Sequence, residues 1–285
     1  MKIIDIIQGK KPSLSFEVFP PKTWDKFDSV LSAALSIAEL KPDFMSVTYG
    51  AGGTTAKYTA EIGEAILEHG VTPLSHLTCV SADKNSIRRE LENLRSKGIE
   101  NVLALRGDIP EGKSVEDLQY RYSSELAREI ADFGGFCIGG ACYPESHPES
   151  PNSAFDIEML KIKVENGCQF LTTQMFFDNN ILYNFMYRLY RAGIDVPVVA
   201  GIMPVTSAGQ IQRLCSISGN ALPQRFIRIV DRYGDNPAAL KQAGIAYATE
   251  QIIDLYANGI NAVHIYSMNK PDVAAAIRNN LTEIV

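Results

Sequence analysis

Residues 72–108 read TPLSHLTCVSADKNSIRRELENLRSKGIENVLALRGD, a complete strand–helix–strand pattern. Apolar, β-rich runs stand at its two ends, and Ile87, Leu91 and Leu94 recur between them at helical spacing. The spacing predicts a helix over 84–97 that stops at Gly98, a residue that commonly follows a helix. The stretch therefore predicts a βα unit followed by a second, parallel strand.

The same alternation continues along the whole chain, with a helical pattern after each β-rich run. The runs are 13–19, 44–50, 72–79, 101–108, 137–143, 170–177, 197–204 and 262–268. Eight such units predict a single (β/α)₈ (TIM) barrel, with extra helices in the longer segment 207–258 between the last two strands. A doubly wound α/β sheet is the alternative, but the chain lacks an early GxGxxG turn. We expect one catalytic domain over residues 1–285.

Composition and charge exclude some classes of binding partner and indicate the cellular compartment. The chain has 285 residues, 46% of them apolar, and a net charge of -6, which argues against nucleic acid or an anionic membrane as the main partner. The first residues are too short and too soon charged for a signal peptide, and no run is long enough to span a membrane. The five cysteines form no Cys-x-x-Cys pair, so we expect reduced thiols in a cytoplasmic protein.

Alternation of side chains along the runs places polar residues inside the predicted barrel, late in the strands where barrel active sites lie. In the first run Leu14, Phe16 and Val18 share the outer face, so Glu17 points into the mouth. The other late interior positions are Thr48, His76, Thr78, Arg106, Asp108 and Gln174. Some could be polar filler, but a whole ring of unpaired buried polar groups would be costly, which favours a site.

Two interpretations of Glu17 are open. Flanked by Phe16, Val18 and Phe19, its carboxyl would be desolvated, which raises its pKa and suits a general acid. The alternative is an ion pair with Arg106. We favour the acid.

The histidines are assigned more simply. His69 ends a helix and has a capping or solvent role, and His264 is a satisfied core residue. His147 stands between Glu145 and Glu149, but nothing completes a metal ligand set, so we expect no metal and favour a hydrogen bond to a cofactor.

Seven segments together resemble the methylenetetrahydrofolate reductase family, in the family's order and over nearly the whole chain. They are FEVFPPK (16–22), SVTYGAGG (46–53), HLTC (76–79), LALRGD (103–108), YPESHPE (143–149), TTQMFFD (172–178) and GIMPV (201–205). Each segment is weak evidence alone, and the set is specific.

The resemblance implies an FAD-containing barrel of one-carbon metabolism and methionine biosynthesis that reduces 5,10-methylenetetrahydrofolate to 5-methyltetrahydrofolate. NADH or NADPH would load the flavin, or a partner subunit would, and a homo-oligomer is implied. Glu17 looks like the acid that protonates folate N10. Asp108 looks placed near flavin and pterin, and Gln174 resembles the amide that orients folate.

The same resemblance implies the residues that contact FAD and substrate. For FAD they are Thr48, Tyr49, Ala51, His76, Arg106, Gly107, Asp108, Ser123, Tyr143, His147, Asp156 and Lys163; for substrate, Gln174, Gln210 and Lys270. Asp156 and Lys163 are seven apart on a predicted helix and share a face, which suits a cation for the diphosphate and a carboxylate for ribose or adenosine. Without the resemblance they could be two solvated charges.

Some positions depart from the family pattern. Met159 and Ile162 replace polar residues near the adenosine end, Leu214 replaces an aromatic residue at the nicotinamide, and Lys270 replaces an arginine. The regulatory extension of eukaryotic members has no counterpart in the 285 residues.

Two other functions are open. A Schiff-base aldolase would need a lysine late in a strand, and none of the eight runs contains one. An FAD-containing barrel subunit acting in electron transfer would not need Glu17, Asp108 and Gln174, all of which are present.

Overall fold

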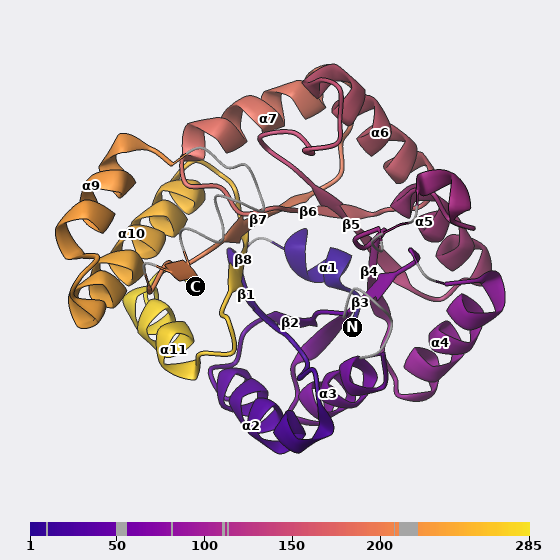
Figure 1. Cartoon of the computed structure of the whole chain (residues 1–285), viewed down its shortest axis with the longest axis horizontal. Helices are drawn as coiled ribbons and strands as arrows, with labels where there is room; N and C mark the ends of the chain where they lie inside the picture. The colour runs from indigo at the N-terminus through magenta and orange to yellow at the C-terminus, as the bar shows by residue number, and fades with distance from the viewer. Residues whose placement is uncertain are drawn as a thin grey trace.

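The computed structural model is a closed barrel of eight parallel strands in sequential order, ringed by helices (Figure 1). It describes residues 1–9, 11–49, 56–80, 82–109, 112, 114–207, 209–210 and 222–285. The strands are β1 (Ser13–Val18), β2 (Phe44–Val47), β3 (Thr72–Thr78), β4 (Asn101–Leu105), β5 (Cys137–Cys142), β6 (Phe170–Thr173), β7 (Val198–Ile202) and β8 (Ala262–Tyr266). Parallel pairing of β1 with β8 closes the barrel, which confirms the predicted fold.

Helices follow the strands as the periodicity predicted. They are α2 (Phe27–Ala38), α3 (Ala56–Glu68), α4 (Lys84–Ser96), α5 (Ser123–Phe133), α6 (Ser153–Glu165), α7 (Asn179–Arg191), α9 (Gln224–Tyr233), α10 (Pro237–Ala257) and α11 (Pro271–Asn280). Helix α4 begins at a capping box of Asp83 and Ser86 and buries Ile87, Leu91 and Leu94. Helices α9 and α10 confirm the extra helices expected before the last strand. None of the described helices is long and apolar enough to cross a membrane.

Side-chain alternation along β1 separates the two layers of the core. Leu14, Phe16 and Val18 pack outward with helix residues such as Ala34 and Ile37. Ser13, Ser15 and Glu17 therefore face the inside. The outward packing is as predicted, but it means that Phe16 and Val18 do not surround the Glu17 carboxyl, and Phe19 is 38% exposed. The residues that bury Glu17 come from other strands.

The N-terminal end of the barrel is closed by the short helix α1 (Ile3–Ile7), which lies over its centre in Figure 1. Ile3 and Ile7 join Phe44, Leu103 and other residues from the strands in one buried cluster. The sequence analysis did not predict this helix, because five residues are too few to show a helical period. Because α1 covers the N-terminal end of the barrel, the C-terminal end of the strands is its open end.

Asn101, buried at the start of β4, fastens α1 to the barrel. Its side-chain oxygen accepts from the Ile3 N–H at 2.8 Å, and its amide donates to the carbonyls of Met1 at 3.1 Å and Pro73 at 3.2 Å.

We expect Asn101→Ala to lower the free energy of unfolding by about 1–3 kcal/mol, because it leaves buried backbone groups without partners. Urea unfolding measures this, with Asn279→Ala, at an exposed position of α11, as the control. Equal midpoints for the two variants would show that Asn101 does not hold the helix.

Candidate active site

Three adjoining cavities at the C-terminal end of the strands form one groove. An inner cavity of about 280 Å³ lies in the barrel mouth, a middle one of about 460 Å³ lies over β4 and β5, and an outer one of about 320 Å³ lies between α5 and α6. The inner and middle cavities share Leu105, Ala141 and Gln174, and Tyr143 lines all three. The groove therefore runs from the barrel interior to the outer helices and suits a long ligand.

Glu17 lies in the inner cavity among side chains of β2, β3 and β8. Its Oε2 is 3.4 Å from Ser46 Oγ, 3.6 Å from His76 Nε2 and 4.0 Å from His264 Nε2. Burial raises the pKa of the Glu17 carboxyl to about 8. Burial also lowers the pKa of both His76 and His264 to about 3, so both imidazoles are neutral near pH 7 and give the carboxylate no counter-charge.

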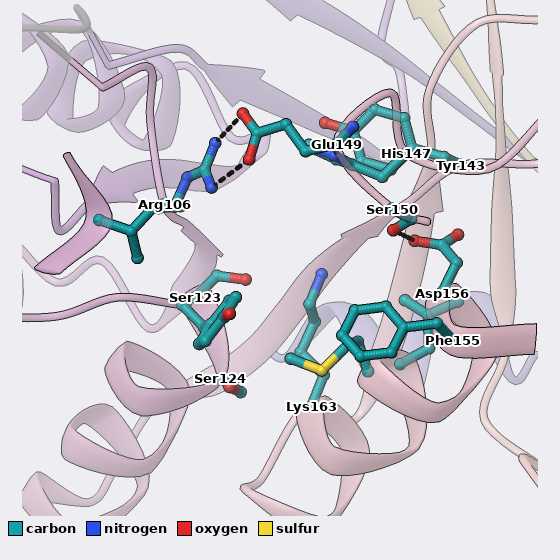
Figure 2. Close-up of a pocket in the computed structure, with 14 residues that line it drawn as sticks. Arg106, Ser123, Ser124, Tyr143, His147, Glu149, Ser150, Phe155, Asp156 and Lys163 are labelled. Atoms are coloured by element: carbon teal, nitrogen blue, oxygen red, sulfur yellow. Dashed lines mark hydrogen bonds and ion pairs between the residues drawn. The ribbon is translucent and has the colours of Figure 1, made fainter. Parts of the chain in front are cut away.

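Arg106 does not pair with Glu17. Its guanidinium donates to both carboxylate oxygens of Glu149, at 2.7 and 2.6 Å, across the groove between the middle and outer cavities (Figure 2). The alternative interpretation of Glu17 as an ion-pair partner of Arg106 is therefore wrong. Without that partner, burial favours the protonated form of the Glu17 carboxyl near neutral pH.

The polar residues expected late in the strands lie at the predicted end, but several lie just beyond it. Strands β2, β4 and β6 end at Val47, Leu105 and Thr173, so Thr48, Arg106, Asp108 and Gln174 stand in the following loops. Backbone bonds from Thr48 N to Val18 O and from Gln174 N to Cys142 O, at 3.0 and 2.7 Å, still hold two of them against neighbouring strands.

Gly107 turns the chain after β4 with a φ of 86°, a conformation that L side chains rarely adopt. A Cβ there would lie 3.0 Å from Val80 and 3.2 Å from Thr78. The turn brings Asp108, which is exposed, to the rim of the middle cavity. Gln174 lines both this cavity and the inner one. It therefore lies between Asp108 and Glu17.

Lys163 and Asp156 of α6 line the outer cavity, as their spacing predicted (Figure 2). Lys163 donates to the Ala141 carbonyl at 2.6 Å, and burial lowers its pKa. Asp156 is 7% exposed and accepts from the Ser150 hydroxyl at 2.9 Å. Neither is a solvated surface charge, so that alternative is wrong.

His147 and Tyr143 form the wall between the middle and outer cavities. Their rings meet edge to face with centroids 4.6 Å apart. His147 Nδ1 accepts the Glu149 N–H at 3.1 Å, which in the neutral ring leaves Nε2–H as a donor. No group of three or more His, Cys, Asp and Glu with metal-binding geometry occurs within the described ranges.

The other expected FAD contacts line the same groove. Tyr49, Gly107 and Ser123 line the middle cavity, and Thr48 and His76 the inner one. Ala51 lies outside the described residues, as do Leu214 and Cys215. Met159 lines the outer cavity, and Ile162 is 37% exposed. The cysteines Cys79, Cys137, Cys142 and Cys168 are buried free thiols.

Gln210 and Lys270, expected to contact substrate, meet at Thr206. Lys270 donates to Thr206 Oγ1 at 2.8 Å, and Gln210 accepts from the Thr206 N–H at 3.2 Å. The Gln210 amide also lies 3.2 Å from the sulfur of Met203, a residue of the inner cavity. The pair therefore flanks the groove without lining any of its three cavities.

Sequence reasoning missed several residues that line the groove or contact Glu17. Ser46 and Thr172 are interior by alternation and could have been found that way. Glu149 was considered only as a metal ligand, and its pairing with Arg106 joins two loops 43 residues apart. Tyr266, the residue of β8 paired with Glu17, also faces the inner cavity.

Comparison with known proteins agrees with this architecture. A family model described as methylenetetrahydrofolate reductase matches residues 2–282. The chain belongs to the methylenetetrahydrofolate reductase family. This confirms the expected family and its enzyme class, an oxidoreductase.

Relatives within the family come from bacteria, plants and yeast. The 5,10-methylenetetrahydrofolate reductases of Pectobacterium carotovorum and Escherichia coli K12 are 33% and 32% identical, over 96% of this chain and 91% and 92% of theirs. The Arabidopsis thaliana methylenetetrahydrofolate reductase (NADH) 1 is 34% identical over 99% of this chain, which spans only 51% of that longer relative. The bacterial relatives are therefore matched over nearly their full length.

Solved structures share the barrel. A Clostridium thermocellum protein described as binding two copies of 5-methyl-5,6,7,8-tetrahydrofolic acid superposes over the whole of both chains, with a TM-score of 0.67 and 13% identity. A dihydropteroate synthase from Xanthomonas albilineans superposes over 96% of this chain, with a TM-score of 0.53 and 13% identity. At this identity the likeness supports the fold alone.

Proposed function

We propose that the chain is a flavin-dependent reductase that converts 5,10-methylenetetrahydrofolate into 5-methyltetrahydrofolate, with the hydride passed through FAD. The observation that carries the proposal is the position of Glu17 at the inner end of a long groove, where burial raises the pKa of its carboxyl to about 8. Membership of the family supports the substrate. FAD, NADH or NADPH as donor, and a cytoplasmic homo-oligomer belong to the proposal.

The groove fits FAD by its unused polar groups as well as by its length. His76 Nε2 and Thr172 Oγ1 are buried without a hydrogen-bond partner in the inner cavity, where a polar ligand would satisfy them. At the outer end, the half-buried Lys163 forms no ion pair among the described residues, and its ammonium group suits a diphosphate. Arg106, Tyr143 and His147 line the path between. When bound, FAD supplies a carrier that accepts a hydride and passes it on.

Glu17 supplies the proton that the substrate needs. Opening the five-membered ring of methylenetetrahydrofolate gives a reactive iminium and leaves an amine at N10, which must be protonated to leave. A carboxyl with a pKa of about 8 retains its proton at neutral pH and can give it to that nitrogen. Gln174, which lines the inner cavity together with Glu17, offers an amide to orient the pterin.

Asp108 supplies negative charge at the rim of the middle cavity. We propose that it faces the iminium cation and the flavin ring. Asp108→Asn should then raise the flavin midpoint potential and slow folate turnover by about tenfold, because a charge 4–6 Å away shifts an ionic equilibrium by about 1–3 pK units and Asp108 is exposed. Redox titration and turnover assays measure both effects.

The matched control for that change is Asp195→Asn, which removes the same charge from an exposed loop before β7, at the opposite end of the barrel. A midpoint potential that moved no more in Asp108→Asn than in the control would place Asp108 away from the flavin.

The electron donor is proposed as NADH, NADPH or a partner subunit. The experiment that tests the function as a whole is identification of the bound flavin and the product. The purified protein should release FAD on denaturation and form 5-methyltetrahydrofolate when its flavin is reduced chemically under anaerobic conditions. FMN in the released fraction, or a barrel that carries electrons but forms no methyl product, would favour an electron-transfer subunit instead.

A further inference from the structure

A line of buried hydrogen-bonding groups runs inside the barrel from Glu17 to the backbone of β8. Ser15, Ser46 and His264 are each at most 1% exposed. His264 Nδ1 lies 2.7 Å from Ser15 Oγ, and its Nε2 lies 2.9 Å from Ser46 Oγ. Ser15 Oγ is also 3.0 Å from the Val263 carbonyl oxygen, and Ser46 Oγ is 3.4 Å from Glu17 Oε2.

With Glu17 protonated, one assignment places a hydrogen in each of the four contacts of this line. In that assignment the Ser15 hydroxyl donates to the Val263 carbonyl, which can only accept, and His264 Nδ1 donates its hydrogen to Ser15. In the neutral imidazole Nε2 is then the acceptor, and it takes the single hydrogen of Ser46. Ser46 then has no hydrogen left for Glu17 and presents a lone pair to the carboxyl. Turned the other way, the Ser46 hydroxyl donates to Glu17 Oε2, which lowers the pKa of the carboxyl.

We propose that His264 is a positioning residue that, by accepting the Ser46 hydrogen, keeps the proton on Glu17. A lone pair facing the carboxyl accepts a hydrogen bond from the protonated acid and repels the ionised form. The inference rests on the proposed role of Glu17 as an acid, because only an acid needs this retained proton. It gives a second task to a histidine that is otherwise a satisfied core residue.

The other groups that face Glu17 carry no charge that would shift its proton equilibrium. His76 of β3 and His264 and Tyr266 of β8 face Glu17, and burial keeps all three neutral near pH 7. Burial lowers the pKa of the two imidazoles and raises the pKa of the phenol. From β2 comes Ser46. Among the described residues no lysine or arginine forms an ion pair with Glu17. The direction of the Ser46 hydrogen is therefore the local feature that distinguishes the two states of the acid.

Two substitutions at one position separate this role from simple filling of space. In His264→Asn the amide can still meet Ser15, but no atom occupies the Nε2 place, so Ser46 is free to donate to the Glu17 carboxylate. In His264→Gln the amide oxygen reaches that place and accepts from Ser46. We expect the pKa of Glu17 to fall by about one unit or more in the first variant and to hold in the second.

A smaller substitution, Ser15→Ala, should also free the Ser46 hydroxyl to donate to Glu17. It removes the acceptor that fixes the imidazole tautomer, so Nε2 can carry the hydrogen and Ser46 can turn to Glu17. The pKa of Glu17 should fall in this variant as well. The prediction therefore does not depend on His264→Asn folding.

The measurement is the infrared C=O band of the Glu17 carboxylic acid, followed against pH in the FAD-loaded protein without folate. Glu17→Gln assigns the band. Ser46→Ala should not lower the pKa, since it leaves no hydrogen to donate, and His264→Asn added to Ser46→Ala should then have no further effect. The proposal would be overturned if His264→Asn lowered the pKa of Glu17 equally with and without Ser46. It would also be overturned if neither His264→Asn nor Ser15→Ala lowered that pKa.

The alkaline limb of the folate half-reaction separates this proposal from the proposed function. If the infrared pKa falls as expected, the limb should move to lower pH by the same amount. A band that moves while the limb stays would uphold the hydrogen-bond line and refute Glu17 as the acid.

Discussion

Glu17→Gln should abolish most of the folate half-reaction while leaving reduction of the flavin intact. Gln keeps the size of the side chain and one hydrogen bond, but it has no proton to give to N10. General acid catalysis typically contributes about 10²–10⁴-fold, so the folate half-reaction should fall by that order. Hydride transfer from the donor requires no proton at N10 and should survive. Single-turnover kinetics of each half-reaction measures the two effects separately.

The pH dependence of the unmodified protein should report the same group. A carboxyl whose pKa is raised to about 8 is protonated below that pH and ionised above it. Rates of the folate half-reaction should therefore be maintained towards neutral pH and fall as the pH rises through about 8. In Glu17→Gln this alkaline limb should be missing from the residual rate.

Glu39→Gln, at an exposed carboxyl just after α2, is the control for Glu17→Gln, and it should leave both half-reactions unchanged. If Glu17→Gln slowed flavin reduction and folate reduction equally, Glu17 would position the flavin or the fold. If neither slowed, the acid would lie elsewhere in the groove.

The second large effect is expected at the outer end of the groove, where Lys163→Met should weaken FAD binding by about 10- to 100-fold. A charge-assisted hydrogen bond contributes about 1.5–3 kcal/mol, and Met retains most of the apolar stem that packs beneath the cavity. The dissociation constant can be measured by flavin fluorescence on titration of the apoprotein.

Lys161→Met is the matched control, because Lys161 lies on the same helix and is exposed. It removes an equal charge without touching the cavity. Equal dissociation constants for the two variants would mean that the diphosphate is held elsewhere, with Arg106 the next residue to test.

Local pattern was sufficient to predict the barrel. Alternation along β1 placed Leu14, Phe16 and Val18 outside and Glu17 inside, and helical spacing placed Asp156 and Lys163 on one face of α6. These predictions succeed because the periods of strands and helices belong to the backbone and do not depend on distant residues.

The partners of each side chain could not be predicted in the same way. His264 meets Ser15 only because β8 pairs with β1, 249 residues apart in sequence. Arg106 selects Glu149 because two loops converge above β4 and β5. The sequence therefore indicated a buried acid but attributed its burial to its neighbours in sequence, whereas residues of β2, β3 and β8 enclose it.

Anaerobic stopped-flow spectroscopy of the purified protein tests the central claim most directly. NADH or NADPH should bleach the flavin absorbance, and mixing with 5,10-methylenetetrahydrofolate should restore it with formation of 5-methyltetrahydrofolate. If neither nucleotide bleaches the flavin, chemical reduction replaces the first step and directs attention to a partner subunit. A reduced flavin that 5,10-methylenetetrahydrofolate does not reoxidise would contradict the account.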